Sequence, residues 1–147
     1  MTDCHTALRI GRLKKDELVR YIKGHCRHRH SYIDHPNCFL TENNIAERVG
    51  FFDIETTGLF GNWDYIISFA LKIGDKVYGR SLTPVEVIDY ATLDKNLIEE
   101  FSELIRKLDR IVVYWGKDRR HDLPFIRTRA LKWNIYFPEY RDVFVTD

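Results

Sequence analysis

The chain has 147 residues, of which 44% are hydrophobic, and a formal net charge of +1 at pH 7. This length suits one domain with a small appendage, and a net charge near zero gives no information about charged partners, although local basic clusters in residues 1–48 and 117–132 could meet phosphates. No apolar run approaches membrane-spanning length, and no apolar signal-peptide core follows Met1. The odd count of three cysteines argues against a disulfide framework. We therefore expect a soluble, cytoplasmic protein that makes no membrane contact.

Residues 1–47 are expected to form an N-terminal appendage. Lys14 to Lys23 has a rough apolar face at helical spacing, and Gly24 after it is a residue that commonly ends helices. Residues 25–47 are rich in His, Asn and Pro and are predicted to form a loop. The appendage has few large apolar residues, so it needs either a metal ion or docking on the core to stay ordered.

Cysteine and histidine side chains are concentrated in this loop. Two thiolates and two imidazoles, suited to a tetrahedral Zn²⁺, come from Cys26, His30, His35 and Cys38. His25 and His28 are alternative ligands, and the spacing is not that of a standard zinc finger. A polar, His-rich loop without metal explains the pattern equally well. Four protein ligands leave no open position, so a zinc ion here would be structural or would support a nucleic-acid-binding knuckle.

The core is expected to begin near Arg48, and its hydrophobic periodicity predicts alternating strands and helices. In chain order these are a buried strand at 49–54, a hairpin of strands at 65–73 and 76–82, a helix at 93–108 capped by Thr92, a strand at 111–115, a helix from 122 to about 133 and a strand at 143–146. The first three strands should run antiparallel. The strand at 111–115 is reached through a helix and should lie parallel to the first.

Acidic side chains follow the first strand of the core. Asp53 and Glu55 are two residues apart, so in a strand both project to one face while Ile54 turns into the core. Like charges side by side repel, and a hard cation such as Mg²⁺ or Mn²⁺ relieves the repulsion. Asp122 follows the neighbouring strand and should reach the same end of the sheet. The alternative is a solvated strand end that carries two acids and no metal.

Two motifs carry a resemblance to a known family. Residues 52–59, Phe-Asp-Ile-Glu-Thr-Thr-Gly-Leu, resemble the first motif of the DEDD exonucleases, which have the ribonuclease H-like fold. Residues 113–130 resemble the second motif, with Gly116 where many members have Asn, His121 in place of the usual Phe, and Asp122 as the third carboxylate. The resemblance implies an α/β core at 48–147, with a mixed sheet of antiparallel and parallel strands flanked by helices.

The resemblance also implies two-metal hydrolysis of DNA or RNA from a single-stranded 3′ end. Asp53 would bridge two Mg²⁺ or Mn²⁺ ions, Glu55 would bind the ion that carries the attacking water, and Asp122 would hold the second ion. The terminal nucleotide would lie on a turn with free backbone N–H groups, formed by Thr56, Thr57, Gly58 and Leu59. Basic side chains would follow the substrate backbone: Arg119, Arg120 and Arg127.

Two further residues of the second motif have structural interpretations. Arg127 and Arg129 project about 200° apart on a helix, so only one can face the site, and the other is expected to be a solvated surface charge. His121 is interpreted as a side chain that packs beneath the start of the helix, with an approach to the catalytic site as the alternative.

One part of the family pattern is not matched. The family carries a fourth carboxylate on a C-terminal helix, whereas Asp147 aligns with the acid that ends the preceding strand. We therefore interpret the chain as truncated before the last catalytic motif and expect little activity from residues 1–147 alone. A catalytically incomplete nucleic-acid-binding module is the alternative function, and the proofreading part of a larger polymerase is a third.

Overall fold

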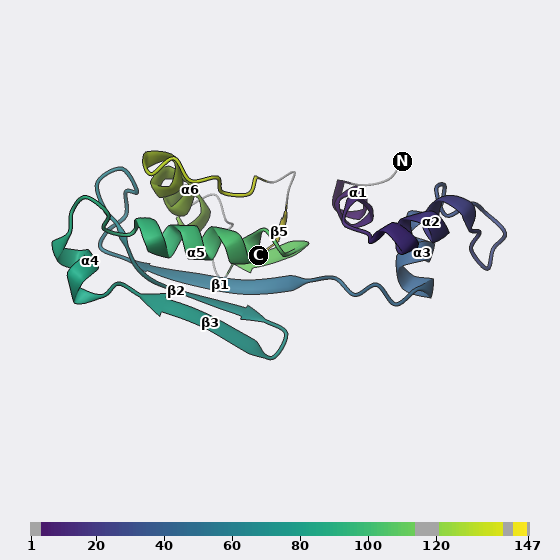
Figure 1. The fold of residues 1–147 in the computed structure, drawn as a ribbon, viewed down its shortest axis with the longest axis horizontal. Coiled ribbons are helices and arrows are strands. Elements are labelled where there is room, and N and C mark those ends of the chain that lie inside the picture. The colour runs from purple at the N-terminus through teal and green to yellow at the C-terminus, as the bar shows by residue number, and fades with distance from the viewer. Residues whose placement is uncertain (1–3, 114–120, 140–142, 147) are drawn as a thin grey trace. The chain divides into compact units, whose positions relative to one another are not determined.

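The computed structural model describes residues 4–113, 121–139 and 143–146. The chain forms two compact units, Met1–Glu47 and Arg48–Asp147, and Figure 1 shows the secondary structure of each. Within the described residues, no helix has the length and apolar character that crossing a membrane requires.

Three helices make up the first unit: α1 (Cys4–Gly11), α2 (Lys15–Lys23) and α3 (Pro36–Glu42). Helix α2 confirms the helix predicted at 14–23, but the loop predicted over 25–47 is wrong where α3 forms. Pro36 occupies the first helical position, where its missing N–H does no harm. The buried Phe39 ring packs edge-on against Tyr21 and Tyr32, at centroid distances of 5.2 and 5.0 Å, and forms the centre of this unit.

A five-stranded sheet in the order β3-β2-β1-β4-β5 forms the second unit. Its strands are β1 (Val49–Thr56), β2 (Ile66–Ile73), β3 (Lys76–Ser81), β4 (Arg110–Val113) and β5 (Phe144–Thr146). Strands β1, β2 and β3 pair antiparallel, whereas β4 is parallel to β1 and β5 is parallel to β4. This mixed sheet confirms the fold class and the strand directions predicted from the sequence.

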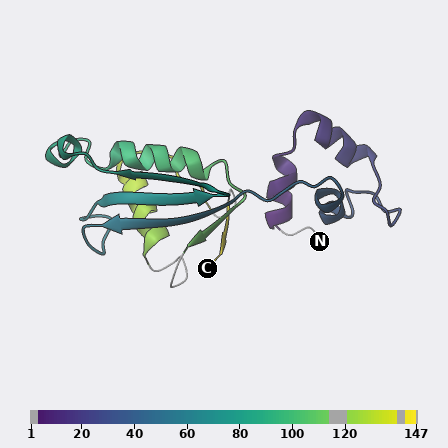
Figure 2. The same cartoon turned by 90° about the horizontal axis from the view of Figure 1, so that it is seen from below.

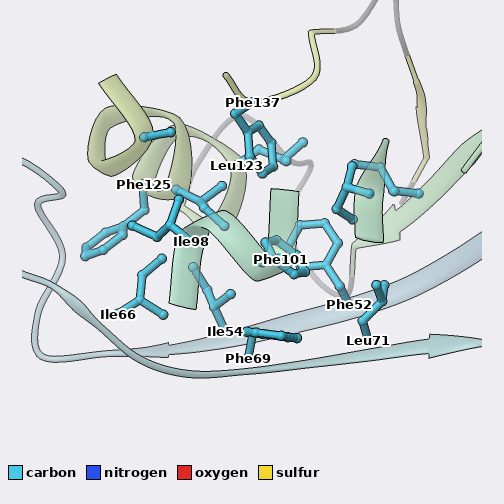
Figure 3. Close-up of a cluster of buried hydrophobic side chains, with 14 of the residues drawn as sticks. Phe52, Ile54, Ile66, Phe69, Leu71, Ile98, Phe101, Leu123, Phe125 and Phe137 are labelled. Atoms are coloured by element: carbon cyan, nitrogen blue, oxygen red, sulfur yellow. The ribbon is translucent and has the colours of Figure 1, made fainter. Parts of the chain in front are cut away.

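Two helices, α5 (Lys95–Ile105) and α6 (Asp122–Lys132), cover one face of the sheet, and the short α4 (Pro84–Ile88) follows β3 (Figure 1). The alternation in β1 turns Phe52 and Ile54 toward these helices. Phe101 of α5 lies among the buried side chains (Figure 3), and its ring centroid is 5.2 Å from Phe52 and 4.9 Å from Phe69. Leu123 of α6 is also fully buried, so both helices are held to the sheet by apolar contacts.

The opposite face of the sheet carries no helix among the described residues of this unit (Figure 2). Phe51 on this face is 53% exposed, and Lys72 and Val77 are exposed beside it. Asp53 and Glu55 project to the same face as Phe51, because side chains alternate along a strand. The fold therefore presents both acids of β1 on an open surface.

The hairpin turn is as predicted, but the start of α5 is not. Gly74 in the β2–β3 turn has φ of 57°, a conformation that glycine adopts without strain. Helix α5 begins at Lys95 with Asp94 as its N-cap, two residues after the predicted start behind Thr92. Leu93 has φ of 34°, outside the helical range, and the Asp94 side chain is engaged by other parts of the core.

A buried ion pair joins three segments of the core. Arg129 of α6 is 1% exposed and donates two hydrogen bonds to Asp94, Nε to Oδ2 at 2.8 Å and Nη2 to Oδ1 at 2.6 Å. Asp94 also accepts from the backbone N–H of Ile66 at 2.9 Å and from the indole of Trp133 at 2.8 Å. Arg129 Nη1 donates to the Gly61 carbonyl at 3.4 Å. The expectation that one of Arg127 and Arg129 faces the site and the other is a solvated surface charge is therefore wrong for Arg129, which is buried in the core.

Removing one partner of this pair should destabilise the core strongly. Asp94→Asn leaves the Arg129 charge buried without its counter-ion, so the free energy of unfolding should fall by about 3–5 kcal/mol. Urea unfolding measures the change. Asp75→Asn, in the exposed hairpin turn, is the matched control and should change stability by less than about 0.5 kcal/mol. A loss below about 1 kcal/mol for Asp94→Asn would mean that Arg129 is not confined as described.

Candidate active site

The acids of β1 border a hollow on the open face of the sheet. In the strand register Asp53 lies opposite Ala70 of β2, and Glu55 lies opposite Ser68. Across the next strand pair Gly79 lies opposite Ala70. These small side chains leave a hollow of about 330 Å³ beside the two carboxylates. The β1 acids therefore have room next to them for ions and for part of a larger substrate.

Asp122 joins the β1 acids from a different element. It is the first residue of α6, and its carboxyl is half-buried. Burial raises the pKa of Asp122, and the negative charge of Asp53 raises it further. The neighbouring His121 lowers this pKa, and Glu55 raises it. The charges of both β1 acids therefore act on Asp122, and whether the three carboxylates converge within reach of one metal site stays a prediction.

The turn after β1 is held by its own hydrogen bonds. Thr57 N–H donates to the Tyr65 carbonyl at 3.0 Å, and Phe60 N–H donates to Asp64 Oδ2 at 3.0 Å. The expectation that the turn keeps its backbone N–H groups free is therefore wrong for Thr57. A Cβ on Gly61 would lie 2.8 Å from the Phe125 carbonyl of α6, so this loop packs too closely on the helix for a side chain there.

The same loop presents apolar side chains to solvent. Leu59 is 74% exposed, Phe60 is 65% exposed and Trp63 is 83% exposed. Leu59 belongs to the turn predicted to hold the terminal nucleotide, whereas Phe60 and Trp63 lie beyond the motif, which ends at residue 59. Two exposed aromatic residues directly after that motif are a sequence signal for a stacking surface.

The basic residues of the second motif have different placements. Arg119 and Arg120, like Gly116, lie outside the described residues. Arg127 is half-buried and donates from Nη2 to the Pro138 carbonyl at 3.4 Å. His121 is half-buried, with Nε2 3.4 Å from Thr56 Oγ1 and its ring centroid 5.3 Å from that of Phe125. His121 thus packs at the start of α6 and also contacts the end of β1.

The Cys/His cluster forms in the first unit with one change of residue. One ligand atom from each of four side chains lies within 4.8 Å of the others: Cys26, His28, His35 and Cys38. His30 was predicted to be the fourth member and is not; its ring stacks on His35 at a centroid distance of 4.2 Å. His28, named in the sequence as an alternative ligand, takes its place because the local turn brings that residue back toward Cys26.

Comparison with known proteins assigns the core to a protein family. A sequence model of the RNase H superfamily matches residues 50–144. The chain belongs to the RNase H superfamily. No curated protein matches the chain. RNase H superfamily domains have nuclease-like, nucleic-acid-related functions and typically use divalent metals. The oxygen donors of Asp53, Glu55 and Asp122 fit such ions chemically, because a dication would stabilise the charged form of Asp122, which burial and the charge of Asp53 disfavour.

Metal binding and metal-free stability should respond in opposite directions to loss of a β1 acid. Burial and the charge of Asp53 raise the folded pKa of Asp122, so the contribution of this carboxyl to metal-free stability is fully present below its unfolded pKa and is lost as pH rises through the folded pKa. Asp53→Asn removes the negative charge of Asp53, which repels the charged form of Asp122. The variant should therefore unfold at a higher temperature than wild type at neutral pH without metal, and Mn²⁺ should no longer stabilise it.

Thermal unfolding with and without Mn²⁺ measures both effects. Wild type and the control Asp75→Asn should gain about 2.7 kcal/mol at a Mn²⁺ concentration 100 times the dissociation constant. An equal Mn²⁺ shift in Asp53→Asn would show that the ion binds elsewhere.

Proposed function

We propose that the core hydrolyses nucleic-acid phosphodiester bonds from a single-stranded 3′ end, as a DEDD-type exonuclease with two Mg²⁺ or Mn²⁺ ions. The observation that carries this proposal is the pair of acids Asp53 and Glu55 beside a hollow on the open face of an RNase H superfamily sheet. The raised pKa of Asp122, caused by burial and by the charges of these acids, supports a role for Asp122 beside them. The match of residues 52–59 to the first DEDD motif supports the exonuclease subtype. The small side chains opposite the acids supply space for a bound strand.

Each acid has a proposed role in holding the ions. Asp53 would contact both, Glu55 would contact the one nearer the attacking water, and Asp122 would contact the other. When bound, the ions would neutralise charge on the scissile phosphate, lower the pKa of the water and stabilise the leaving 3′ oxygen. We place the fourth carboxylate of the DEDD pattern outside the described residues, where Asp142 and Asp147 also lie.

The loop after β1 is proposed to hold the terminal nucleotide. Thr56 and Gly58 are linked by a hydrogen bond from Thr56 Oγ1 to the Gly58 carbonyl at 2.7 Å, which shapes the turn beside the acids. Leu59 would wedge against a base, and Phe60 and Trp63 would offer ring faces for stacking. Arg127 would assist by holding the α6 side of the site, and Arg119 and Arg120 would meet phosphates.

Cleavage should depend on Mg²⁺ or Mn²⁺ and on Asp53. Asp53→Asn removes the ligand shared by both ions, so the rate should fall by at least about 10²-fold, while Asp75→Asn leaves it unchanged. The assay follows a 5′-labelled single-stranded oligonucleotide of DNA or RNA.

A second oligonucleotide with a blocked 3′ end separates the candidate functions. An exonuclease should leave the blocked strand intact. Equal cleavage of blocked and free strands would instead indicate an endonuclease. Metal-dependent binding of the free strand without any cleavage of it would favour the nucleic-acid-binding module.

Trp63 should affect substrate binding and leave metal binding unchanged. Trp63→Ala removes a stacking surface for a base, so binding of a single-stranded oligonucleotide should weaken by about 1–3 kcal/mol. Trp63→Phe keeps a ring and should retain most of the affinity. Fluorescence anisotropy with Ca²⁺ in place of Mg²⁺ measures the dissociation constants without turnover. Identical constants for Trp63→Ala and Trp63→Phe would show that stacking at this position does not contribute.

A further inference from the structure

The Cys/His cluster of the first unit has the dimensions of a tetrahedral metal site. His28 Nδ1 lies 3.8 Å from Cys26 Sγ and 3.8 Å from Cys38 Sγ. A zinc ion with Zn–S bonds of about 2.3 Å and Zn–N bonds of about 2.0–2.1 Å sets neighbouring S and N ligands about 3.6 Å apart. A contraction of a few tenths of an ångström would therefore bring His28 and both sulfurs onto one ion.

Two short backbone structures bring the four side chains together. Cys26 N–H donates to the His30 carbonyl at 2.9 Å, and Arg29, at φ of 66°, closes a tight turn that places Cys26 and His28 at one end. His35 is the N-cap of α3, and Cys38 lies in the first turn of that helix. Cys38 N–H donates to the His35 carbonyl at 3.0 Å, which fixes the spacing of the second pair. A turn and a helix start each contribute one sulfur and one imidazole.

We propose that Cys26, His28, His35 and Cys38 bind one structural Zn²⁺ that holds the turn at 25–31 to the start of α3. Two thiolates and two imidazoles are a donor set that selects zinc over Mg²⁺ or Mn²⁺. Four protein ligands leave no position for water, so this ion takes no part in hydrolysis at the acidic site. A disulfide between Cys26 and Cys38 would use both sulfurs but would give the two converging imidazoles no role.

The first unit is small, so a bound zinc ion would contribute much of its folding free energy. Among its described residues, the buried side chains are Thr6, Cys26, Pro36, Phe39 and Leu40. Helix α2 has no buried residue at all. A unit of this size with so little apolar burial is marginal without a cross-link, and metal binding supplies folding free energy directly.

Metal analysis of the purified chain tests the proposal. Protein prepared without chelator should contain about one zinc per chain, and Co²⁺ replacement should give the visible absorption of tetrahedral thiolate coordination. His28→Ala and Cys38→Ser should lose the ion. His30→Ala is the matched control and should retain it. Loss of zinc from His30→Ala with retention by His28→Ala would overturn this ligand set.

Limited proteolysis supplies a readout that does not depend on the variants folding. Chelator treatment of the wild-type chain should open residues 4–47 to cleavage while the core at 48–147 stays protected, and added Zn²⁺ should restore protection. Metal-free wild type that is equally resistant, or a Cys26–Cys38 disulfide found by peptide mapping of freshly purified protein, would contradict the proposal. Metal content and protection do not depend on nuclease activity, so this result stands apart from the test of the core.

Discussion

The arrangement of the candidate active site depends on the buried ion pair between Asp94 and Arg129. A charged pair removed from water is stable only when its hydrogen bonds are satisfied, and here Ile66, Trp133 and Gly61 supply the remaining partners. Gly61 lies in the loop after β1, Ile66 begins β2, and Trp133 is the C-cap of α6, the helix that begins with Asp122. The pair therefore fixes α6 relative to the first-strand motif, although neither of its residues is proposed to touch substrate.

The open face of the sheet is where this positioning has a chemical consequence. Asp53 and Glu55 project there because β1 alternates, and Asp122 is the first residue of α6. Burial raises the pKa of Asp122, and repulsion from Asp53 raises it further, so a charged Asp122 is electrostatically unfavourable without a metal ion. If the proposed ions bind here, the acids cost the metal-free fold some stability, which is the usual relation between functional residues and the stability of a fold.

Elements whose burial follows a regular period could be predicted from the sequence, and long-range polar contacts could not. The strands and α5 were found because Phe52, Ile54 and Phe101 fall at strand and helix spacing. Arg129 was misjudged because its partner, Asp94, lies 35 residues away in the chain. His28 and His30 could not be distinguished by spacing, since the turn around Arg29 decides which imidazole faces the thiols. Helix α4 had a readable signal, because Thr83 and Glu86 form a capping box.

Crystals of the protein soaked in Mn²⁺ offer the most direct measurement, because anomalous scattering locates this ion independently of the protein atoms. The account predicts Mn²⁺ bound to Asp53 on the open face, with Glu55 or Asp122 completing the coordination at oxygen distances. Absence of Mn²⁺ at Asp53 would contradict it. So would an Asp122 carboxylate more than roughly 10 Å from both β1 acids, since two ions of one catalytic site lie only about 3.5–4 Å apart.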